Sequence, residues 1–338
     1  MPKQFRISVT EYHTAGEPFR IVTGGIGPIL GQTILEKRRF AQERLDHVRR
    51  LVINEPRGHA DMYGCFITEP VTEGAAFGTL FFHNEGYSTA CGHGTIALAT
   101  WALEHGIVEP AADTGETVIT IDVPSGPVEA VAQVEAGRVT SVRFRNVPAF
   151  VYATDIPVGG VAGDLVADVA FGGAFYAIVD ARELGIAVAP ENLDSLIRLG
   201  RSIKAAIMDK LDVRHPEEPE LRGIYGVIFC QREPDADGHM CQRNVTVFAD
   251  GAVDRSPCGS GTSARLAHLF HHGQLGIGDE LLHRSIIGTE FTGRVTGLVR
   301  SAGHDAVITE VTSSAHLTGT HQFILEPDDP LGTGFLLR

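Results

Sequence analysis

Short segments in which apolar and polar side chains alternate, or in which β-branched residues cluster, dominate this chain of 338 residues. Alternation of this kind turns one side of a strand towards a core and the other towards solvent, so it predicts β-strands. The clearest examples are residues 5–9, 118–123, 139–144, 243–248, 294–299 and 306–311. Glycine is abundant, with 39 residues, and strand patterns outnumber helix patterns.

Four segments have the periodicity of helices. Residues 33–50 carry a run of charged side chains around a few apolar ones, which is typical of an amphipathic surface helix with its charges in solvent. Residues 191–211 are similar, and their apolar set is Leu193, Leu196, Ile197, Ile203 and Ile207. Residues 95–103 are apolar nearly all round, as expected of a helix enclosed by a sheet. Residues 262–272 are more polar, so we expect that helix to be less completely enclosed.

The last two helices follow near copies of one motif. Residues 91–95 are Cys-Gly-His-Gly-Thr, and residues 258–262 are Cys-Gly-Ser-Gly-Thr. Each motif runs into an Ala- and Leu-rich stretch that stops at a His-Gly pair, and in both copies that glycine lies fifteen residues after the cysteine. The spacing predicts a helix with a cysteine at its N-terminus and a glycine that closes its last turn.

The paired motifs indicate acid–base chemistry. A helix N-terminus presents unpaired backbone N–H groups and a partial positive charge, so it binds anions and lowers the pKa of a nearby cysteine. Two such ends facing one cleft would hold Cys91 and Cys258 on opposite sides of a small carboxylate. One thiolate could then act as base and one thiol as acid at the adjacent carbon, and the two would titrate as a coupled pair. His93 could help to stabilise the thiolate.

The other three cysteines are predicted to be small buried apolar residues, which is the commonest state of a free cysteine. Cys65 and Cys230 lie in strand-like stretches, and Cys241 is placed in a polar loop around residues 234–238.

A zinc site of Cys91, His93 and Cys258 is the less favoured interpretation of the motifs. The neighbouring glycines suit close approach of the backbone to a ligand better than coordination by side chains. We therefore predict no metal.

The duplicated motif predicts an α/β (α+β) protein of two pseudo-symmetric halves, each a curved, mostly antiparallel sheet around a central helix. The first half is expected to span residues 1–147 and the second residues 148–320, with a last strand at 321–326 that could return to the first half. Residues 327–330 are expected to form a turn. A cleft between two domains is a favoured site for a small ligand.

Composition narrows the class of protein. A net charge of −14 and a pI of about 5.5 argue against a nucleic-acid binder, which needs a basic face. Five cysteines without regular spacing argue against a secreted disulfide scaffold. The N-terminus has no signal-peptide pattern, and the longest apolar stretch, residues 170–179, is far too short for a membrane span. A soluble cytoplasmic enzyme with a small-molecule substrate is expected.

Several motifs together resemble the proline racemase superfamily, which includes proline racemase, 4-hydroxyproline 2-epimerase and trans-3-hydroxy-L-proline dehydratase. The resemblance covers nearly the whole chain, and its motifs are His-Thr-Ala-Gly-Glu-Pro at 13–18, Glu-Pro-Arg-Gly-His at 55–59, Cys-Gly-His at 91–93, Val-Pro-Ala-Phe at 147–150, Ala-Phe-Gly-Gly at 170–173 and Asp-Arg-Ser-Pro-Cys-Gly-Ser-Gly at 254–261. It implies a fold like that of diaminopimelate epimerase, a homodimer, and catalysis without pyridoxal phosphate, metal or other cofactor.

The resemblance also implies roles for individual residues. Cys91 and Cys258 would be the acid/base pair, and Asp254 would hold the ring nitrogen of the substrate. The remaining expected contacts are backbone N–H groups for the substrate carboxylate and aromatic rings against the substrate ring, from Gly92, His93, Gly259, Ser260, Tyr63 and Phe248. Asp254 has an alternative role in capping the turn before Ser256 and Pro257, but a cationic ring nitrogen in a closed cleft needs a counter-charge.

Two signals conflict over the reaction. A cysteine pair is the pattern usual for racemases and epimerases, and the most familiar dehydratase of the superfamily has Thr at the position of Cys258. The segments at 61–64, 83–88 and 150–155 instead resemble the dehydratase branch. We favour dehydration of trans-3-hydroxy-L-proline to pyrroline-2-carboxylate, with 4-hydroxyproline 2-epimerase or proline racemase activity as the alternative. A non-catalytic protein that binds an imino acid is the outside alternative, and the second thiol argues against it.

Overall fold

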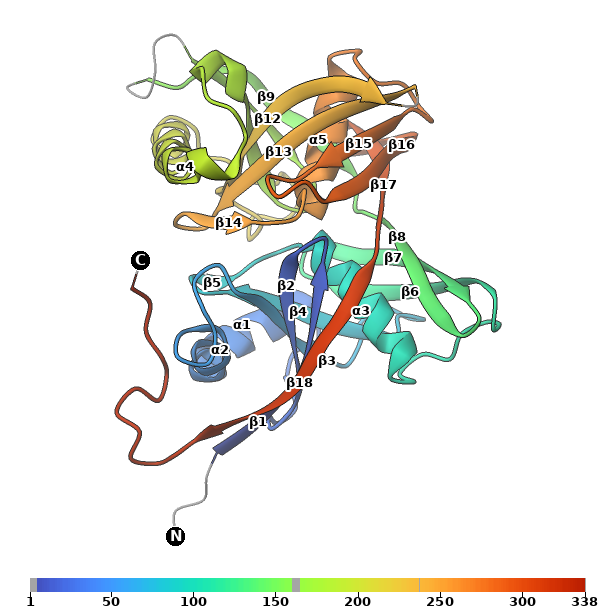
Figure 1. The fold of residues 1–338 in the computed structure, drawn as a ribbon, viewed down its shortest axis with the longest axis vertical. Helices are drawn as coiled ribbons and strands as arrows, with labels where there is room; N and C mark the ends of the chain where they lie inside the picture. The colour runs from blue at the N-terminus through green and yellow to red at the C-terminus, as the bar shows by residue number, and fades with distance from the viewer. Residues whose placement is uncertain (1–4, 160–164, 237, 338) are drawn as a thin grey trace. The chain divides into compact units, whose positions relative to one another are not determined.

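The computed structural model describes residues 5–159, 165–236 and 238–337 (Figure 1). The chain forms two compact units: residues 1–89, 94–142 and 314–338 make up the first, and residues 90–93 and 143–313 the second. The chain therefore leaves the first unit near residue 142, a few residues before the predicted boundary at 147, and re-enters it at residue 314. The short piece that contains Cys91 belongs, by its contacts, to the second unit.

The first unit is built on one sheet. Its strands pair in the order β18 (Ala315–Leu325), β1 (Phe5–Thr14), β2 (Glu17–Gly24), β3 (Tyr63–Thr68), β4 (Phe77–His83), β6 (Gly115–Val123) and β7 (Gly126–Glu135), with β5 (Gly86–Tyr87) folded back on β4. The pairs β2–β3 and β4–β6 are parallel and the others antiparallel. Figure 1 shows the last strand, β18, running beside the first, β1.

Helices cover both faces of this sheet. Side chains alternate along β4, so Phe77 meets Trp101 of α3 (Gly92–Glu104), while Leu80 and Phe82 join the apolar cluster of α1 (Ile34–Arg44) and α2 (Asp46–Ile53). Every residue of β4 is buried as a result. The apolar composition of α3 follows from its position, because all of its residues from Gly92 to Ala102 are buried.

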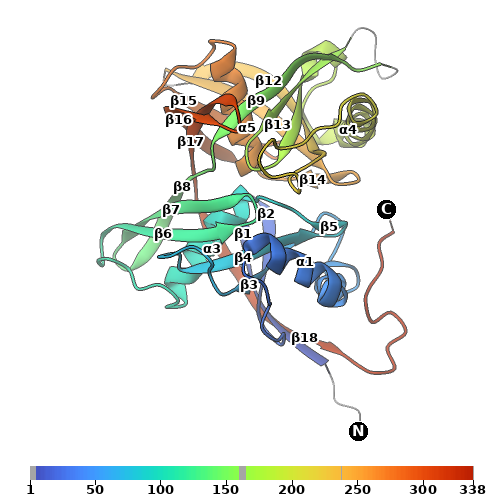
Figure 2. The same cartoon turned by 180° about the vertical axis from the view of Figure 1, so that it is seen from behind.

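The second unit is a closed ring of strands around a helix. The ring runs β9 (Ala149–Pro157), β10 (Val166–Phe171), β11 (Phe175–Asp180), β12 (Ile224–Ala236), β13 (His239–Phe248), β15 (Glu280–Arg284), β16 (Glu290–Ser301) and β17 (His304–Ser313), and β17 pairs back with β9. Inside it, α5 (Gly259–His271) contacts β9, β10, β11, β16 and β17. Outside it, α4 (Leu193–Met208) lies on β12 and β13 (Figure 2). The strand β14 (Ala252–Asp254) pairs with β13, and β8 (Arg138–Arg145) carries the chain from the first unit into the second.

Both units have the same topology. In the first, β1–β2 is antiparallel, β2–β3 parallel, β3–β4 antiparallel, β4–β6 parallel and β6–β7 antiparallel. The pairs β10–β11, β11–β12, β12–β13, β13–β15 and β15–β16 repeat that order in the second. In each unit the buried helix follows a short strand, β5 or β14. The duplicated cysteine motif thus marks a duplicated α/β fold, as predicted.

All six strands predicted from alternation lie within observed strands, but the helix predicted at 33–50 is wrong in two respects. It is two helices, separated at Leu45, whose side chain packs into the apolar cluster while its backbone leaves helical geometry. Its charges are also not all in solvent. Lys37 is buried with its ammonium donating to the Glu69 carbonyl, and Arg49 is buried with its guanidinium donating to the carbonyls of His83 and Asn84.

One further expectation is confirmed and one needs correction. The polar helix α5 is somewhat less enclosed than α3, as expected, since His268, Phe270 and His271 are not fully buried. Its Arg265 is nevertheless buried, and the guanidinium donates to Gln242 and His268. Cys241 is buried in β13 and does not lie in a loop, although residue 237 of the predicted loop falls outside the described residues. The helix predicted at 191–211 is α4. In the described part of the chain no helix is both long and apolar enough to span a membrane.

Candidate active site

The N-termini of α3 and α5 meet at two glycines. A methyl group built on Gly92 would lie 2.4 Å from the Cα of Gly259, and one built on Gly259 would lie 2.5 Å from the Cα of Gly92. The ring of Phe144 closes the same point, 2.7 Å from the methyl position on Gly92. Only glycine permits this contact, which brings the two helix starts into one site.

Cys91 lies immediately before α3, beside an imidazole. Its Sγ is 3.5 Å from each ring nitrogen of His93, and both side chains are buried. Burial, and then the charge of Arg255, lower the pKa of His93 to about 3. The imidazole is therefore neutral at physiological pH. It can donate a hydrogen bond to the Cys91 thiolate, but it carries no positive charge that would stabilise the thiolate further.

Cys258 caps the N-terminus of α5 with unusual backbone geometry. Its φ is +66°, a conformation that a side chain with a Cβ seldom adopts, and its carbonyl accepts the first hydrogen bond of the helix from Thr262. Burial raises the pKa of the thiol, and the Asp254 carboxylate raises it further. Cys258 therefore holds its proton, as an acid should.

Asp254 fills one of the two roles considered for it, the cap of the turn before Ser256. One oxygen, Oδ1, accepts from the backbone N–H and the hydroxyl of Ser256, which caps the turn. The other, Oδ2, lies 4.0 Å from Nδ1 of His93. Burial raises the pKa of this carboxyl to about 6, so it remains ionised at neutral pH and can hold a cation.

Asp254 and the aromatic ring of Phe248 lie on the same face of the hairpin that β13 and β14 form. Asp254 pairs with Thr246 across β13 and β14, and Phe248 points to the same face two residues further along β13. Phe248 is buried and stacks on Tyr225, with ring centroids 5.5 Å apart. Thr246 faces the sulfur of Cys258. The predicted ring-packing residue thus shares a face with the predicted counter-charge.

Tyr63 belongs to the first unit. It is buried in β3, its ring stacks on Phe19, and its hydroxyl is hydrogen-bonded to that of Ser88, three residues before Cys91. The other predicted site residues, Cys91, Gly92, His93, Phe248, Asp254, Cys258, Gly259 and Ser260, all lie in the second unit.

Two site residues were missed from the sequence, Tyr176 and Gly172. Gly172 abuts the first turn of α5, where a methyl group would lie 2.3 Å from the carbonyl oxygen of Ser260. Tyr176 follows on β11, with its hydroxyl 2.7 Å from Ser260 Oγ and 3.7 Å from Cys258 Sγ. A tyrosine within the apolar stretch at 170–179 was the available signal, since a buried hydroxyl needs a partner.

This arrangement has the parts needed to move a proton at a carbon beside a carboxylate: two thiols, two helix starts and a buried carboxylate. The model of the family described as "Proline racemase" matches residues 9–336. The chain belongs to the proline racemase family.

Two relatives in this family have different names. Over 325 residues, 96% of each chain, the protein is 47% identical to a trans-3-hydroxy-L-proline dehydratase of Bacillus cereus. Over 333 residues, 98% of each chain, it is 46% identical to a 3-hydroxyproline 2-epimerase of Burkholderia multivorans.

Solved structures share the fold. A hydroxyproline epimerase from Agrobacterium vitis, solved with bound trans-4-hydroxy-L-proline, superposes with a TM-score of 0.89 at 34% identity and covers 98% of this chain and 96% of its own. A PhzF-family protein from Bacillus anthracis gives a TM-score of 0.56 at 14% identity and covers 94% of this chain and 99% of its own, which is a likeness of fold alone.

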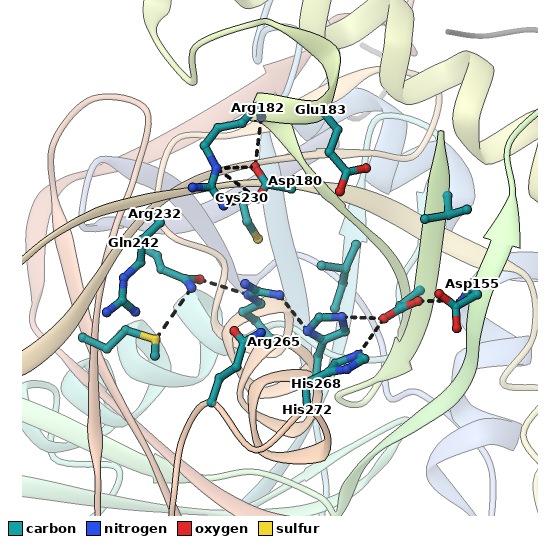
Figure 3. Close-up of a pocket in the computed structure, with 15 residues that line it drawn as sticks. Asp155, Asp180, Arg182, Glu183, Cys230, Arg232, Gln242, Arg265, His268 and His272 are labelled. Atoms are coloured by element: carbon teal, nitrogen blue, oxygen red, sulfur yellow. Dashed lines mark hydrogen bonds and ion pairs between the residues drawn. The ribbon is translucent and has the colours of Figure 1, made fainter. Parts of the chain in front are cut away.

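A second cluster of polar side chains lies at the far end of α5 (Figure 3). His268 and His272 both direct Nε2 at Oδ2 of Asp168, at 2.7 and 2.9 Å, and these donor atoms are close enough together to surround a metal ion. The helical rise of 1.5 Å per residue puts His268 roughly 15 Å from Cys258. The cluster borders a pocket of about 550 Å³.

Proton placement opposes a metal ion at this cluster. Arg265 is always protonated and lies 2.7 Å from Nδ1 of His268, so Nδ1 must accept and Nε2 must carry the ring proton. That proton is donated to Asp168, whose pKa is lowered by these hydrogen bonds. A ligating histidine normally needs the reverse, with a free lone pair on Nε2 and a donor at Nδ1. The cluster is a closed chain of hydrogen bonds, and metal binding would require Arg265 to give up its hydrogen bond to His268.

Proposed function

We propose that this protein is a trans-3-hydroxy-L-proline dehydratase that uses Cys91 as the base at Cα. The observation that supports the proposal is the meeting of two cysteine-bearing helix starts at Gly92 and Gly259, beside Asp254. The helix N–H groups would bind the substrate carboxylate, and the ionised Asp254 would pair with the ring ammonium. Phe248 would pack against the ring.

The geometry of the substrate assigns the elimination to one face. In trans-3-hydroxy-L-proline the hydroxyl is trans to the carboxylate, so it lies on the same side of the ring as the Cα hydrogen. The Cys91 thiolate would take the Cα proton, the C–H electron pair would form the Cα–Cβ double bond, and the C3 hydroxyl would leave with that proton as water. The enamine product then tautomerises to the cyclic imine, pyrroline-2-carboxylate. Only one thiol is needed.

A second candidate, inversion at C2 of 3-hydroxyproline, is favoured by the second thiol. Inversion removes a proton from one face and returns one to the other, so it requires an acid opposite the base. Cys258, whose pKa is raised by burial and by Asp254, fits that acid. One active site could carry out both reactions, with the fate of the carbanion deciding between them.

The deciding experiment uses wild-type protein and the variant Cys258→Thr with trans-3-hydroxy-L-proline in D2O. For a dehydratase we expect imine from both proteins, and a loss of any C2 epimer in the variant by about a hundredfold or more. Trans-4-hydroxy-L-proline and L-proline are the comparison substrates.

The opposite results are equally clear. Inversion of a hydroxyproline without imine would replace the dehydratase with an epimerase. Binding without deuterium at Cα would leave only an imino-acid-binding protein.

We further propose a cytoplasmic homodimer that needs no cofactor. All five cysteines are free and buried, in keeping with a reducing compartment. The chain itself supplies base, acid, anion site and counter-charge, so activity is expected to survive prolonged dialysis against a chelator. The dimer follows the family resemblance, and light scattering of the purified protein tests it.

A further inference from the structure

The hydroxyl of Tyr176 lies between two side chains of the α5 start. It is 3.7 Å from Sγ of Cys258 and 2.7 Å from Oγ of Ser260, and all three residues are buried. The ring of Tyr176 is fixed by β11 and by an edge-on contact with Tyr225 at 5.7 Å. The three polar groups therefore form a short chain that ends at the sulfur.

The direction of this chain depends on the proton of Cys258. When Cys258 is a thiol, its S–H donates to the Tyr176 oxygen, and the Tyr176 hydroxyl donates to Ser260. When Cys258 is a thiolate it has no proton to donate, so the Tyr176 hydroxyl must turn towards Sγ. The Ser260 hydroxyl can then donate to Tyr176. Either hydroxyl can be the donor between Tyr176 and Ser260, so the chain satisfies either state of the sulfur.

Tyr176 keeps its own proton throughout this exchange. Burial raises its pKa well above the ordinary value, and the neighbouring Cys258 and Tyr225 act in the same direction. It is therefore a donor to the sulfur and not a competing acid. The other groups that face Sγ are the Asp254 carboxylate, the Thr246 hydroxyl and the backbone N–H of Gly261.

Because Asp254 opposes a thiolate, the uncharged donors around Sγ decide how readily Cys258 gives up its proton. We propose that Tyr176 is a positioning residue that makes Cys258 competent in both proton states, through the reversible chain Cys258–Tyr176–Ser260. This inference deepens the proposed function and rests on it for the reaction, but not for the titration of the thiol. It assigns Tyr176 to the C2 exchange that uses Cys258, and not to the elimination that uses Cys91.

The test is the variant Tyr176→Phe, which keeps the buried ring and removes only the hydroxyl. The first measurement is the rate of iodoacetamide labelling at Cys258 and at Cys91 as a function of pH, read by peptide mass spectrometry. A hydrogen bond to a charged group contributes enough to shift a pKa by about one unit, so labelling of Cys258 below its pKa should fall roughly tenfold. Labelling of Cys91 should be unchanged.

The second measurement compares the two reactions of the same variant. Deuterium exchange that leads to the C2 epimer should fall about tenfold, whereas imine formation should change less than about threefold. The matched control is Tyr152→Phe, which removes a hydroxyl bonded to the Asp212 carbonyl on the surface of the same unit.

The outcomes separate this inference from the function itself. An unchanged pH profile of Cys258, or an equal fall in both reactions, overturns the role of Tyr176 and leaves the function standing. A shifted profile in a protein inactive on every hydroxyproline supports Tyr176 and overturns the function. If Cys258 is unreactive in both proteins, the ratio of epimer to imine decides.

Discussion

Cys91 and Cys258 occupy equivalent positions at two helix starts, yet their surroundings differ. Cys91 has a neutral imidazole against its sulfur, whereas Cys258 has a carboxylate and two hydroxyls and sits at positive φ. A negative neighbour disfavours a second negative charge, so the asymmetry supports the proposed roles of Cys91 as base and Cys258 as acid.

Cys91→Ala is expected to lower dehydration and Cα deuterium exchange to below about one per cent, because both begin with its thiolate. The fold should survive, since the change removes one small buried sulfur next to the site. Steady-state rates and circular dichroism check the two halves of this prediction. Retention of several per cent of the exchange rate would show that Cys91 is not the base.

Asp254→Asn should be more stable than wild type at pH 8 and less active. The pKa of Asp254 is about 3.8 in the unfolded chain and about 6 in the folded protein. The folded protein therefore has its full stability below pH 3.8, where the carboxyl is protonated in both states, and it loses stability as pH rises through about 6. The asparagine avoids that loss and can still accept from Ser256, so it should gain up to about 3 kcal/mol in urea unfolding at pH 8 and nothing below about pH 4.

The activity of this variant should move the other way. Wild-type kcat/KM is expected to rise with pH through about 6 as Asp254 ionises. In the asparagine variant kcat/KM should no longer rise with pH through about 6. At pH 8 its kcat/KM should be at least about tenfold below that of the wild type. A variant that is active and keeps that rise with pH would show that another group titrates there.

At the scale of elements, the site depends on two helices that begin in contact. The close approach at Gly92 and Gly259 leaves no room for a Cβ on either residue, whereas the glycines that end the motif helices, Gly106 and Gly273, have open space and need only their positive φ. Glycine is thus required at the start of each helix for lack of space and at the end of each helix for its positive φ.

Gly92→Ala should destabilise the protein by about 1–3 kcal/mol and abolish activity, because one helix start must move. The control is Gly297→Ala in β16, whose added methyl group meets nothing within 4 Å. Thermal unfolding and turnover of both variants check the contrast. Normal activity in Gly92→Ala would show that the helix starts are further apart than described.

At the scale of the whole molecule, five cysteines offer an internal comparison. Cys65 lies in the core of the first unit, where burial raises the pKa of its thiol to about 12, and Cys230 and Cys241 are buried in the second. Only Cys91 and Cys258 adjoin helix starts.

Iodoacetamide should therefore label Cys91 first, because Cys258 holds its proton. Pyrrole-2-carboxylate, which is planar at Cα like the carbanion, should protect both and raise the unfolding temperature, since a site built for the transition state binds its analogue tightly. Peptide mapping and thermal scans provide the measurement. Preferential labelling of Cys65, Cys230 or Cys241 counts against the site.

The sequence by itself determined the strands, the repeated motif and the position of two cysteines at helix starts. Alternation along segments such as 243–248 reports which side of a strand is buried, and a Cys-Gly-x-Gly motif repeated at matched spacing reports two equivalent helix starts. These are local properties, set by backbone geometry and by the preference of apolar side chains for a core.

The tertiary structure decided what depends on neighbours distant in the sequence. Burial by other elements makes His93 neutral and raises the pKa of Asp254, and no local pattern records that burial. It also brings Tyr176 to Cys258, 82 positions away, and draws Lys37 and Arg49 out of solvent onto carbonyls of other segments. Charge, pKa and hydrogen bonding at a site are sums over everything packed around it, so they exist only once the chain has folded.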